Sequence, residues 1–268
     1  MENQVLTKSF SNAIRSPPAF TGSLVDWSIN SREITATIID LIVRDLLSIS
    51  NDKIFITKKT IGLKKFEKTF ISILFKNKKS LTFNELKNQY KKYSNELIKI
   101  ICIGLIDNDI IQKDFQKKLA GASKKAMEET LGFVPKIPSN AKRLDLPEWI
   151  LRPLLSVMGL KPMFDNMSDN AKKNLGKPFE DVLLTQKGKL LEQESVALKE
   201  FMKNYPMSDE RLANEFIGHS IVFGIGEFWI NKFGDKNIKL KELFDMLDTQ
   251  EAKIMNFVDM DEYLKEFN

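Results

Sequence analysis

Cysteine and histidine are almost absent from this sequence. Cys102 lies in the apolar run LIKIICIGLI, and His219 is the only histidine. One cysteine cannot form a disulfide within the chain, so we expect a small buried residue in a protein of the reducing cytoplasm. Zinc sites built from several histidines and cysteines are excluded for the same reason. A catalytic triad could use only His219, and its neighbours Gly218 and Ser220 give no sign of one, so we interpret this histidine as structural.

Long apolar runs and common ligand-binding motifs are also missing. No stretch reaches the roughly 18 apolar residues that a membrane-spanning helix requires, and the N-terminus lacks the apolar core of a signal peptide. Gly224 and Gly226 lack the third glycine of a dinucleotide-binding loop, and there is no P-loop. The acidic residues do not follow the spacing of a calcium-binding loop. We therefore predict a cytoplasmic protein without a membrane span, cofactor, metal ion or catalytic residue, and we leave open a peripheral association with a membrane.

Positive charge is concentrated in the middle of the chain. The net charge is +5, but the segment from Lys53 to Lys125 holds 18 lysines and 6 acidic residues, a net charge of +12. Such a segment favours an anionic partner or contact with the protein's own acidic C-terminal part, although a solvated lysine-rich surface would give the same pattern. The lysines that we predict to bind an anionic partner are Lys58, Lys59, Lys64, Lys65, Lys68, Lys76, Lys78 and Lys79.

Hydrophobic periodicity predicts a mainly α-helical protein with small β-wings. Residues 1–29 contain the turn signals SPP and TGS and are expected to be irregular. After them, an amphipathic helical pattern leads twice through an Asn/Asp turn into a short β-branched strand, in IIDLIVRDLLSISNDKIFI and in LIKIICIGLIDNDIIQ. Because a helix followed by a short β-wing is typical of the end of a winged-helix domain, we predict two tandem winged-helix-like units followed by a helical C-terminal domain.

These patterns divide the chain into four predicted parts. They are an N-terminal segment with the first winged-helix-like unit at 1–62, the second unit at 63–118, a Pro-rich connector at 119–180 and the C-terminal helical domain at 181–268. Within the second unit, separate helices are expected at 81–90 and 93–106. Five prolines exclude one long helix in the connector. For its apolar stretch LPEWILRPLLSVMGLKPMF the alternatives are a core-docked helix pair, a segment at a membrane interface, and a partner surface or loop.

The polar faces of the two predicted recognition helices are poorly suited to DNA. At 100° per residue, the apolar side chains of residues 33–47 fill one wide arc. The opposite arc, which we expect to face solvent, carries Glu33, Thr37, Asp40 and Arg44. The corresponding arc of the second helix carries Asn95, Glu96 and Lys99. DNA affinity depends largely on Lys and Arg at the phosphates, so these acidic or near-neutral arcs favour a protein-interaction or dimerisation module.

The stretch FIGHSIVFGIGEFW, residues 216–229, combines the histidine with three glycines and a tryptophan. We predict a tightly packed helix here, because the stretch is too short to span a membrane. Its glycines, Gly218, Gly224 and Gly226, would allow close approach of another helix and so offset the roughly 1 kcal/mol that glycine loses to alanine in a helix. The aromatic residues that would fill the core are Phe223, Phe228 and Trp229.

Several motifs share an order and spacing with one known family. RSPPAF precedes REITATIIDLIVRDLLSI, and FEKTFISILF, LIKIICIGLIDNDII, LTQKGKLLEQESVALKEFM and FIGHSIVFGIGEFWINKF follow. Over roughly 15–118 and 180–235, the chain resembles the cytoplasmic region of domain-of-unknown-function family 2207, a family of predicted membrane proteins. The positions of the first helix that match the family pattern are Thr35, Ala36, Thr37, Asp40, Leu41, Arg44, Leu47 and Ile49; Asp45 and Leu46 depart from it.

The resemblance does not imply an enzymatic activity. Members of that family usually have an extracytoplasmic domain and membrane spans, which this sequence lacks, so the chain resembles the cytoplasmic part alone. The family has no established activity and supplies no catalytic residues. Our leading hypothesis is a non-enzymatic interaction or regulatory module, with a protein partner first, an anionic membrane surface second and nucleic acid disfavoured. A winged-helix DNA-binding transcriptional regulator is the alternative, and an enzyme comes third.

Overall fold

The computed structural model describes residues 10–58, 62–113, 183–204, 210–233, 238–250 and 255–256. Lys59, the predicted connector at 119–180 and the end of the chain beyond residue 256 lie outside the described residues. The part that is described is mainly helical, with a small three-stranded antiparallel sheet and a two-stranded pair. This confirms the predicted mainly α class with small β elements. No helix in these ranges is both long and apolar enough to cross a bilayer.

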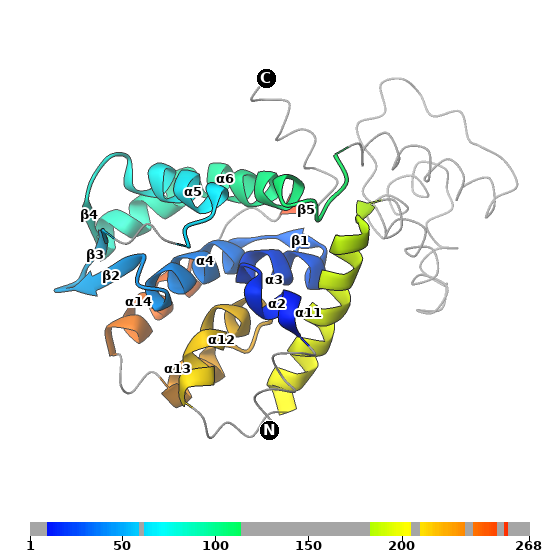
Figure 1. The fold of residues 1–268 in the computed structure, drawn as a ribbon. Helices are drawn as coiled ribbons and strands as arrows, with labels where there is room; N and C mark the ends of the chain where they lie inside the picture. The colour runs from blue at the N-terminus through cyan, green and yellow to red at the C-terminus, as the bar shows by residue number, and fades with distance from the viewer. Residues whose placement is uncertain are drawn as a thin grey trace, which may run out of the picture. The chain divides into compact units, whose positions relative to one another are not determined.

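The elements follow one another in a simple order (Figure 1). The helices are α2 (Ser11–Arg15), α3 (Pro18–Asp26), α4 (Ser31–Val43), α5 (Lys65–Phe75), α6 (Phe83–Asp107), α11 (Gln186–Asn204), α12 (Glu210–Val222), α13 (Gly226–Phe233) and α14 (Ile238–Asp248). The strands are β1 (Ser28–Ile29), β2 (Leu47–Ser50), β3 (Lys53–Ile56), β4 (Ser80–Thr82) and β5 (Met255–Asn256).

The chain divides into two units, and the larger one is discontinuous in sequence. It combines Met1–Asn108 with Leu190–Asn268, and the second unit is Asp109–Lys189. In the described part of the second unit, Ile111 and Leu184 form an isolated antiparallel β-bridge. The strand predicted in DNDIIQ is therefore reduced to one bridge. The four-part division of the chain stays a prediction; the structure adds that β3 and β4, from opposite sides of residue 62, pair with each other.

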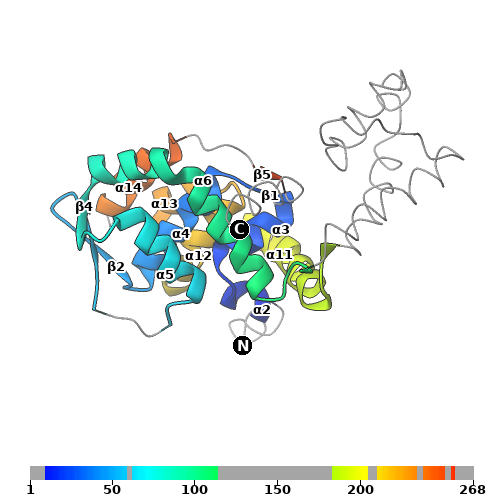
Figure 2. The ribbon, with the colours of Figure 1, turned by 90° about the horizontal axis from the view of Figure 1, so that it is seen from above.

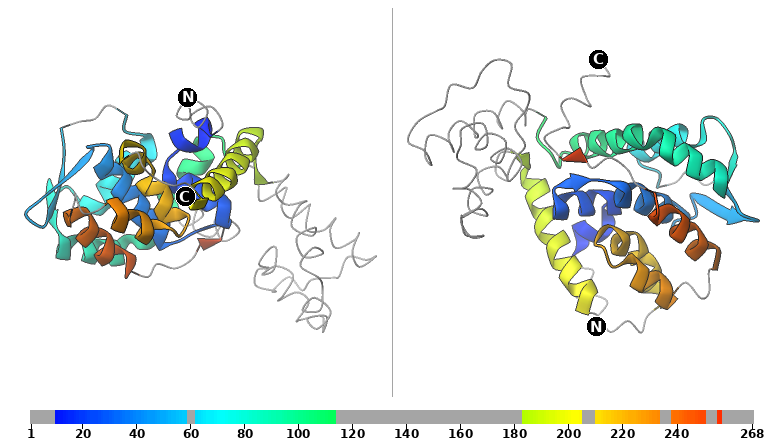
Figure 3. Two further views of the ribbon diagram at one scale, coloured as in Figure 1. Left: turned by 90° about the horizontal axis from the view of Figure 1, so that it is seen from below. Right: turned by 180° about the vertical axis from the view of Figure 1, so that it is seen from behind.

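Helix α4 lies at the centre of the larger unit. Helices α5 and α6 lie on one side of it, and α12 and α14 lie on the other (Figures 1 and 3). Every side chain from Glu33 to Ile39 is buried. The helix begins with a capping box, because Asn30 Oδ1 accepts from the Arg32 N–H and Glu33 Oε2 accepts from the Asn30 N–H. The predicted solvent-facing arc of this helix is therefore wrong, since α3, α5 and α12 cover it.

The three-stranded sheet has the order β2-β3-β4, with both pairings antiparallel. Asn51 and Asp52, both with positive φ, form the two-residue turn between β2 and β3, which is the turn that hairpins favour. Strand β4 was not predicted. Strand β4 includes Leu81 and Thr82, which were expected to be helical. Helix α6 begins only at Phe83, because the Thr82 hydroxyl caps it by accepting from the Glu85 N–H. The helices predicted at 81–90 and 93–106 correspond to the two halves of α6, which meet at a kink where Tyr93 has non-helical backbone angles.

Residues 11–15 and 18–26 are helical, which corrects the expectation of irregular structure for the described part of 1–29. Pro18 occupies the first turn of α3, where a missing N–H costs nothing. Helix α2 is held by Glu194 of α11, whose carboxylate accepts hydrogen bonds from the Asn12 and Ala13 N–H groups at 2.7 and 3.0 Å. The partner that stabilises α2 is thus about 180 residues away in sequence, where a local pattern cannot show it.

The stretch 216–229 forms parts of two helices, so the prediction of one helix is wrong. Gly224 has φ +74° and ends α12, and α13 begins at Gly226. Gly218 does allow a close approach, since a Cβ there would lie 2.6 Å from Pro18 Cγ. Phe223 and Trp229 are buried as predicted, but Phe228 is 60% exposed.

His219 is buried within α12. Its Nε2 lies 3.1 Å from the carbonyl oxygen of Ala13, and the rings of Phe216 and Phe223 lie beside it. This position is what a structural histidine would occupy.

Gly22 provides a test of how tightly α3 and α12 pack. A Cβ at this position would overlap Val222 Cβ and lie 2.7 Å from Glu33 Oε1. We expect Gly22→Ala to lower the free energy of unfolding by about 2 kcal/mol in urea titrations, because overpacking outweighs the better helix propensity of alanine. Asn88→Ala at an exposed position of α6 is the control and should be neutral or stabilising. Equal effects of the two variants would contradict the close packing.

Candidate functional site

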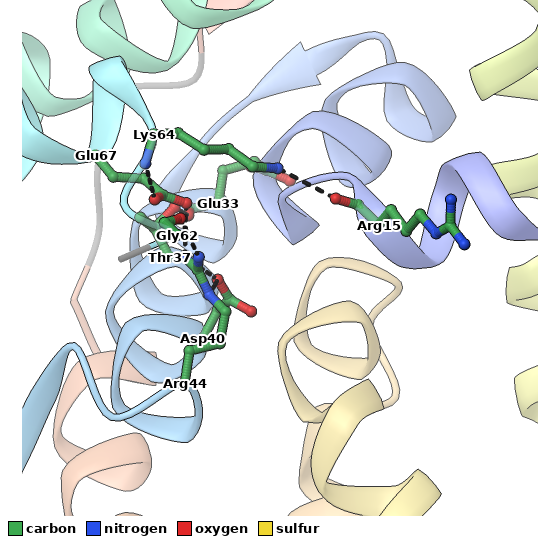
Figure 4. Close-up of polar contacts among 8 residues, drawn as sticks. All are labelled: Arg15, Glu33, Thr37, Asp40, Arg44, Gly62, Lys64 and Glu67. Carbon is green, nitrogen blue, oxygen red and sulfur yellow. Dashed lines mark hydrogen bonds and ion pairs between the residues drawn. The ribbon is translucent and has the colours of Figure 1, made fainter. Parts of the chain in front are cut away.

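A cluster of charged side chains lies between α4 and the start of α5 (Figure 4). Arg44 donates through Nε to Asp40 Oδ2 at 2.8 Å and through Nη2 to Glu67 Oε1 at 2.6 Å. The side chain of Glu67 is 1% exposed, and that of Asp40 is 17% exposed. A single arginine therefore pairs with two largely buried carboxylates from different helices. We call Asp40, Arg44 and Glu67 the ion cluster.

The ion cluster also fixes the chain that leads into α5. Glu67 Oε2 accepts from the Lys64 N–H at 2.7 Å, and Arg44 Nη1 lies 3.3 Å from the Gly62 carbonyl oxygen. Lys64 Nζ turns away and donates to the Arg15 carbonyl at 3.2 Å (Figure 4). The ion cluster therefore connects α4 with the start of α5, and Lys64 connects the start of α5 with α2.

Glu33 lies on the same polar stripe of α4, nearer the start of the helix, and is completely buried. One carboxylate oxygen caps the helix, and the other, Oε1, has no hydrogen-bond partner among the described residues. Burial raises the pKa of Glu33 to about 8 and that of Asp40 to about 6, because a charged carboxylate loses its hydration there. Glu33 is therefore largely protonated at neutral pH.

The polar groups of the ion cluster are engaged in contacts within the fold. The carboxylates of the ion cluster are already occupied by Arg44 and backbone N–H groups. Within the described ranges, no group of three or more His, Cys, Asp or Glu side chains could hold a metal ion. Cys102 is buried, and burial raises the pKa of its thiol above the usual range. The sequence does contain a signal for the cluster: Glu33, Thr37, Asp40 and Arg44 form one continuous polar stripe on a helix.

The predicted anion-binding lysines are only partly brought together. Lys65 and Lys68 are exposed on α5, and Lys76, Lys78 and Lys79 are exposed in the turn between α5 and β4. Lys58 lies after β3, Lys64 is turned toward Arg15, and Lys59 lies outside the described residues. The sequence analysis missed Lys91 and Lys92, which are exposed on the neighbouring α6. We define the basic face as Lys65, Lys68, Lys76, Lys78, Lys79, Lys91 and Lys92.

Tyr93 connects the two helices of the basic face. Lys76 follows α5 directly, and its Nζ lies 4.2 Å from the centroid of the Tyr93 ring, while Lys92 Nζ of α6 lies 5.2 Å from it. Both distances are within the range of cation–π interactions. Figure 2 shows α5 and α6 side by side on the same surface of the unit. Lys76 and Lys92, which come from neighbouring helical segments, therefore meet at one ring.

Acidic residues neutralise only part of the basic face. Asp107 pairs with Lys65 at 2.9 Å, and Glu85 pairs with Lys78 at 2.8 Å. The hydrogen bond from Lys78 lowers the pKa of Glu85 to about 2. Lys68, Lys79 and Lys91 form no ion pair with any residue in the described part of the chain. Two of the seven lysines of the basic face are thus paired with an acidic residue of the described structure.

Comparisons with protein-family models, curated proteins and solved structures found no match to this chain. The functional argument therefore depends on the residues and contacts described above.

Proposed function

We propose that this protein is a non-enzymatic interaction or regulatory module that binds an anionic partner through the basic face. The observation that supports this proposal is the group of exposed lysines on α5, the following turn and α6, of which Lys68, Lys79 and Lys91 form no ion pair with a described residue. Uncompensated charge on one surface raises the local concentration of an oppositely charged partner.

The alternative, a winged-helix DNA-binding regulator, receives less support. A recognition helix must expose one face to enter the major groove. Helix α4 is buried along most of its length, and the second half of α6 is buried at Leu97–Cys102. Lys99, expected on the polar arc of α6, is 2% exposed. Sequence-specific reading of DNA by these two helices is therefore disfavoured, whereas non-specific contact through lysines stays possible.

The finer architectural assignment is also a proposal. We propose that the chain corresponds to the cytoplasmic region of the family of unknown function that it resembles, and that its helix–hairpin segments are winged-helix-like. The helix α4 followed by the β2–β3 hairpin supports this order of elements. Solving the structure of a member of that family would test the assignment, because the same order and the same central helix should then recur.

Charge-matched variants test the proposed function. We expect the protein to bind at least one of three anionic probes at low salt: a labelled random DNA duplex, a labelled polyglutamate peptide, or vesicles with anionic lipid. Binding should weaken as salt screens the charges. The triple variant Lys68→Gln, Lys79→Gln and Lys91→Gln should reduce this affinity by at least tenfold, since each lysine near an anionic surface contributes about 1 kcal/mol.

The control removes the same charge elsewhere. Lys187→Gln, Lys203→Gln and Lys241→Gln alter lysines of α11 and α14, outside the basic face. This variant should keep most of the affinity. No binding to any probe at low salt would contradict the proposed function, and so would equal losses in the two triple variants.

A further inference from the structure

We infer that the anionic partner of the basic face is a lipid bilayer surface rich in acidic headgroups. This inference depends on the proposed function and names its partner class. Three features of the basic face support it: polar residues between the lysines, no exposed large apolar side chain and no arginine, and the position of α6 beside α5.

The composition of the basic face does not fit a protein partner. Protein interfaces have a core enriched in aromatic residues and arginine, and they are depleted in lysine. The large apolar side chains that are exposed in the described structure are Ile56, Leu190, Val196 and Phe228, none of which lies on α5 or α6. Between Lys68 and Lys76, the exposed positions are Thr69 and Ser72. A partner protein would find charge here but no apolar anchor.

Nucleic acid is also a poorer fit. Proteins that bind single strands usually offer aromatic rings on which bases stack. Tyr93 is half-buried, and the ammonium groups of Lys76 and Lys92 lie over its ring, where a base would have to stack. Specific contacts to phosphate often use the planar guanidinium of arginine. Every basic residue from Lys53 to Lys125 is lysine, so the face supplies diffuse charge and no bidentate donors.

The arrangement of the lysines suits an extended charged surface. Lys65 and Lys68 lie about one turn apart on α5, and Lys76 follows the helix as its left-handed C-cap residue. Lys91 and Lys92 lie on α6, which runs beside α5 (Figure 2). Flexible point charges on two neighbouring helices and the turn after α5 can meet an anionic bilayer without entering a groove. The attraction should be reversible and sensitive to salt, because no exposed apolar side chain on these helices would insert.

Co-sedimentation with vesicles tests this inference. We expect the full chain to bind phosphatidylcholine vesicles that contain phosphatidylserine and not to bind vesicles of phosphatidylcholine alone. Removal of one lysine should weaken binding about fivefold, and the triple variant at Lys68, Lys79 and Lys91 about a hundredfold. The triple variant at Lys187, Lys203 and Lys241 should bind nearly as well as the wild type. Bound vesicles should also protect Lys68 and Lys91 from acetylation.

The outcomes separate this inference from the proposed function. Binding of DNA or polyglutamate through the same lysines, without binding of anionic vesicles, would overturn the lipid inference and leave the proposed function in place. Equal binding to neutral and anionic vesicles, or protection confined to other lysines, would also overturn it. Failure to bind any of the three probes at low salt would overturn both.

Discussion

Replacement of Arg44 by alanine is expected to lower the free energy of unfolding by about 3 to 5 kcal/mol, the range observed when one partner of a buried ion pair is removed. Without the guanidinium, the carboxylates of Asp40 and Glu67 would be left together in a largely buried space. Arg44 also contacts the Gly62 carbonyl, so the path of the chain into α5 would lose a contact as well. Urea titration followed by far-UV circular dichroism measures the change.

A matched arginine on the same helix is the control for this prediction. Arg32 pairs with Asp26 at 2.9 Å, but the two side chains are 38% and 24% exposed. Because exposed pairs contribute about 0 to 1 kcal/mol, Arg32→Ala should have a much smaller effect than Arg44→Ala. Arg44→Lys should fall between the two, since it keeps the charge but loses the forked geometry. Similar losses for the two alanine variants would show that the ion cluster does not stabilise the fold.

Glu33 should make the protein less stable as the pH rises from about 5 to 8, by up to about 4 kcal/mol. Its pKa is raised from 4.5 to about 8 by burial. In this range the unfolded chain has already released the proton while the folded chain still holds it, so the unfolded state binds fewer protons and stability falls with increasing pH. Asp40, with a pKa raised to about 6, adds to the decline in its lower part.

The variant Glu33→Gln isolates the contribution of this residue. Glutamine can take the same place in a capping box and does not ionise. Below about pH 5 the variant should be no more stable than the wild type, and near pH 8 it should be clearly more stable. Glu200→Gln removes an exposed carboxylate of α11 and should leave the pH dependence unchanged. A constant difference between Glu33→Gln and the wild type across this range would contradict the buried, protonated state of Glu33.

Local sequence signals predicted much of the secondary structure in the larger unit. The apolar period of residues 31–43 and the Asn/Asp turn after β2 both correspond to elements of the structure. So does the break after Phe75, where α5 ends before the lysine-rich turn. These features depend on propensity, on periodicity and on the left-handed conformation that Asn and Asp tolerate, which are properties of a short stretch of chain. The burial of Cys102 follows from the apolar run around it.

The polar residues of α4 show where such reasoning fails. Glu33, Thr37 and Asp40 have the spacing of a solvent-facing stripe, and helical periodicity assigned them to the surface. In the structure Glu33 and Thr37 are buried, since α3 and α12 pack against the same side. Helix α12 begins more than 160 residues after α4 ends. A pattern within one helix cannot indicate that a distant segment will cover its polar face.

The sequence by itself thus determined the helical class, the position of the hairpin and the concentration of lysine between residues 53 and 125. Those properties are local, because they arise from the spacing and charge of neighbouring residues. Only the tertiary structure decided which of the lysines share a surface and which polar residues of α4 become a buried ion cluster. Both depend on contacts between segments far apart in the chain: α5 must lie beside α6 to form the basic face, and Arg44 must reach Glu67 to stabilise two buried carboxylates.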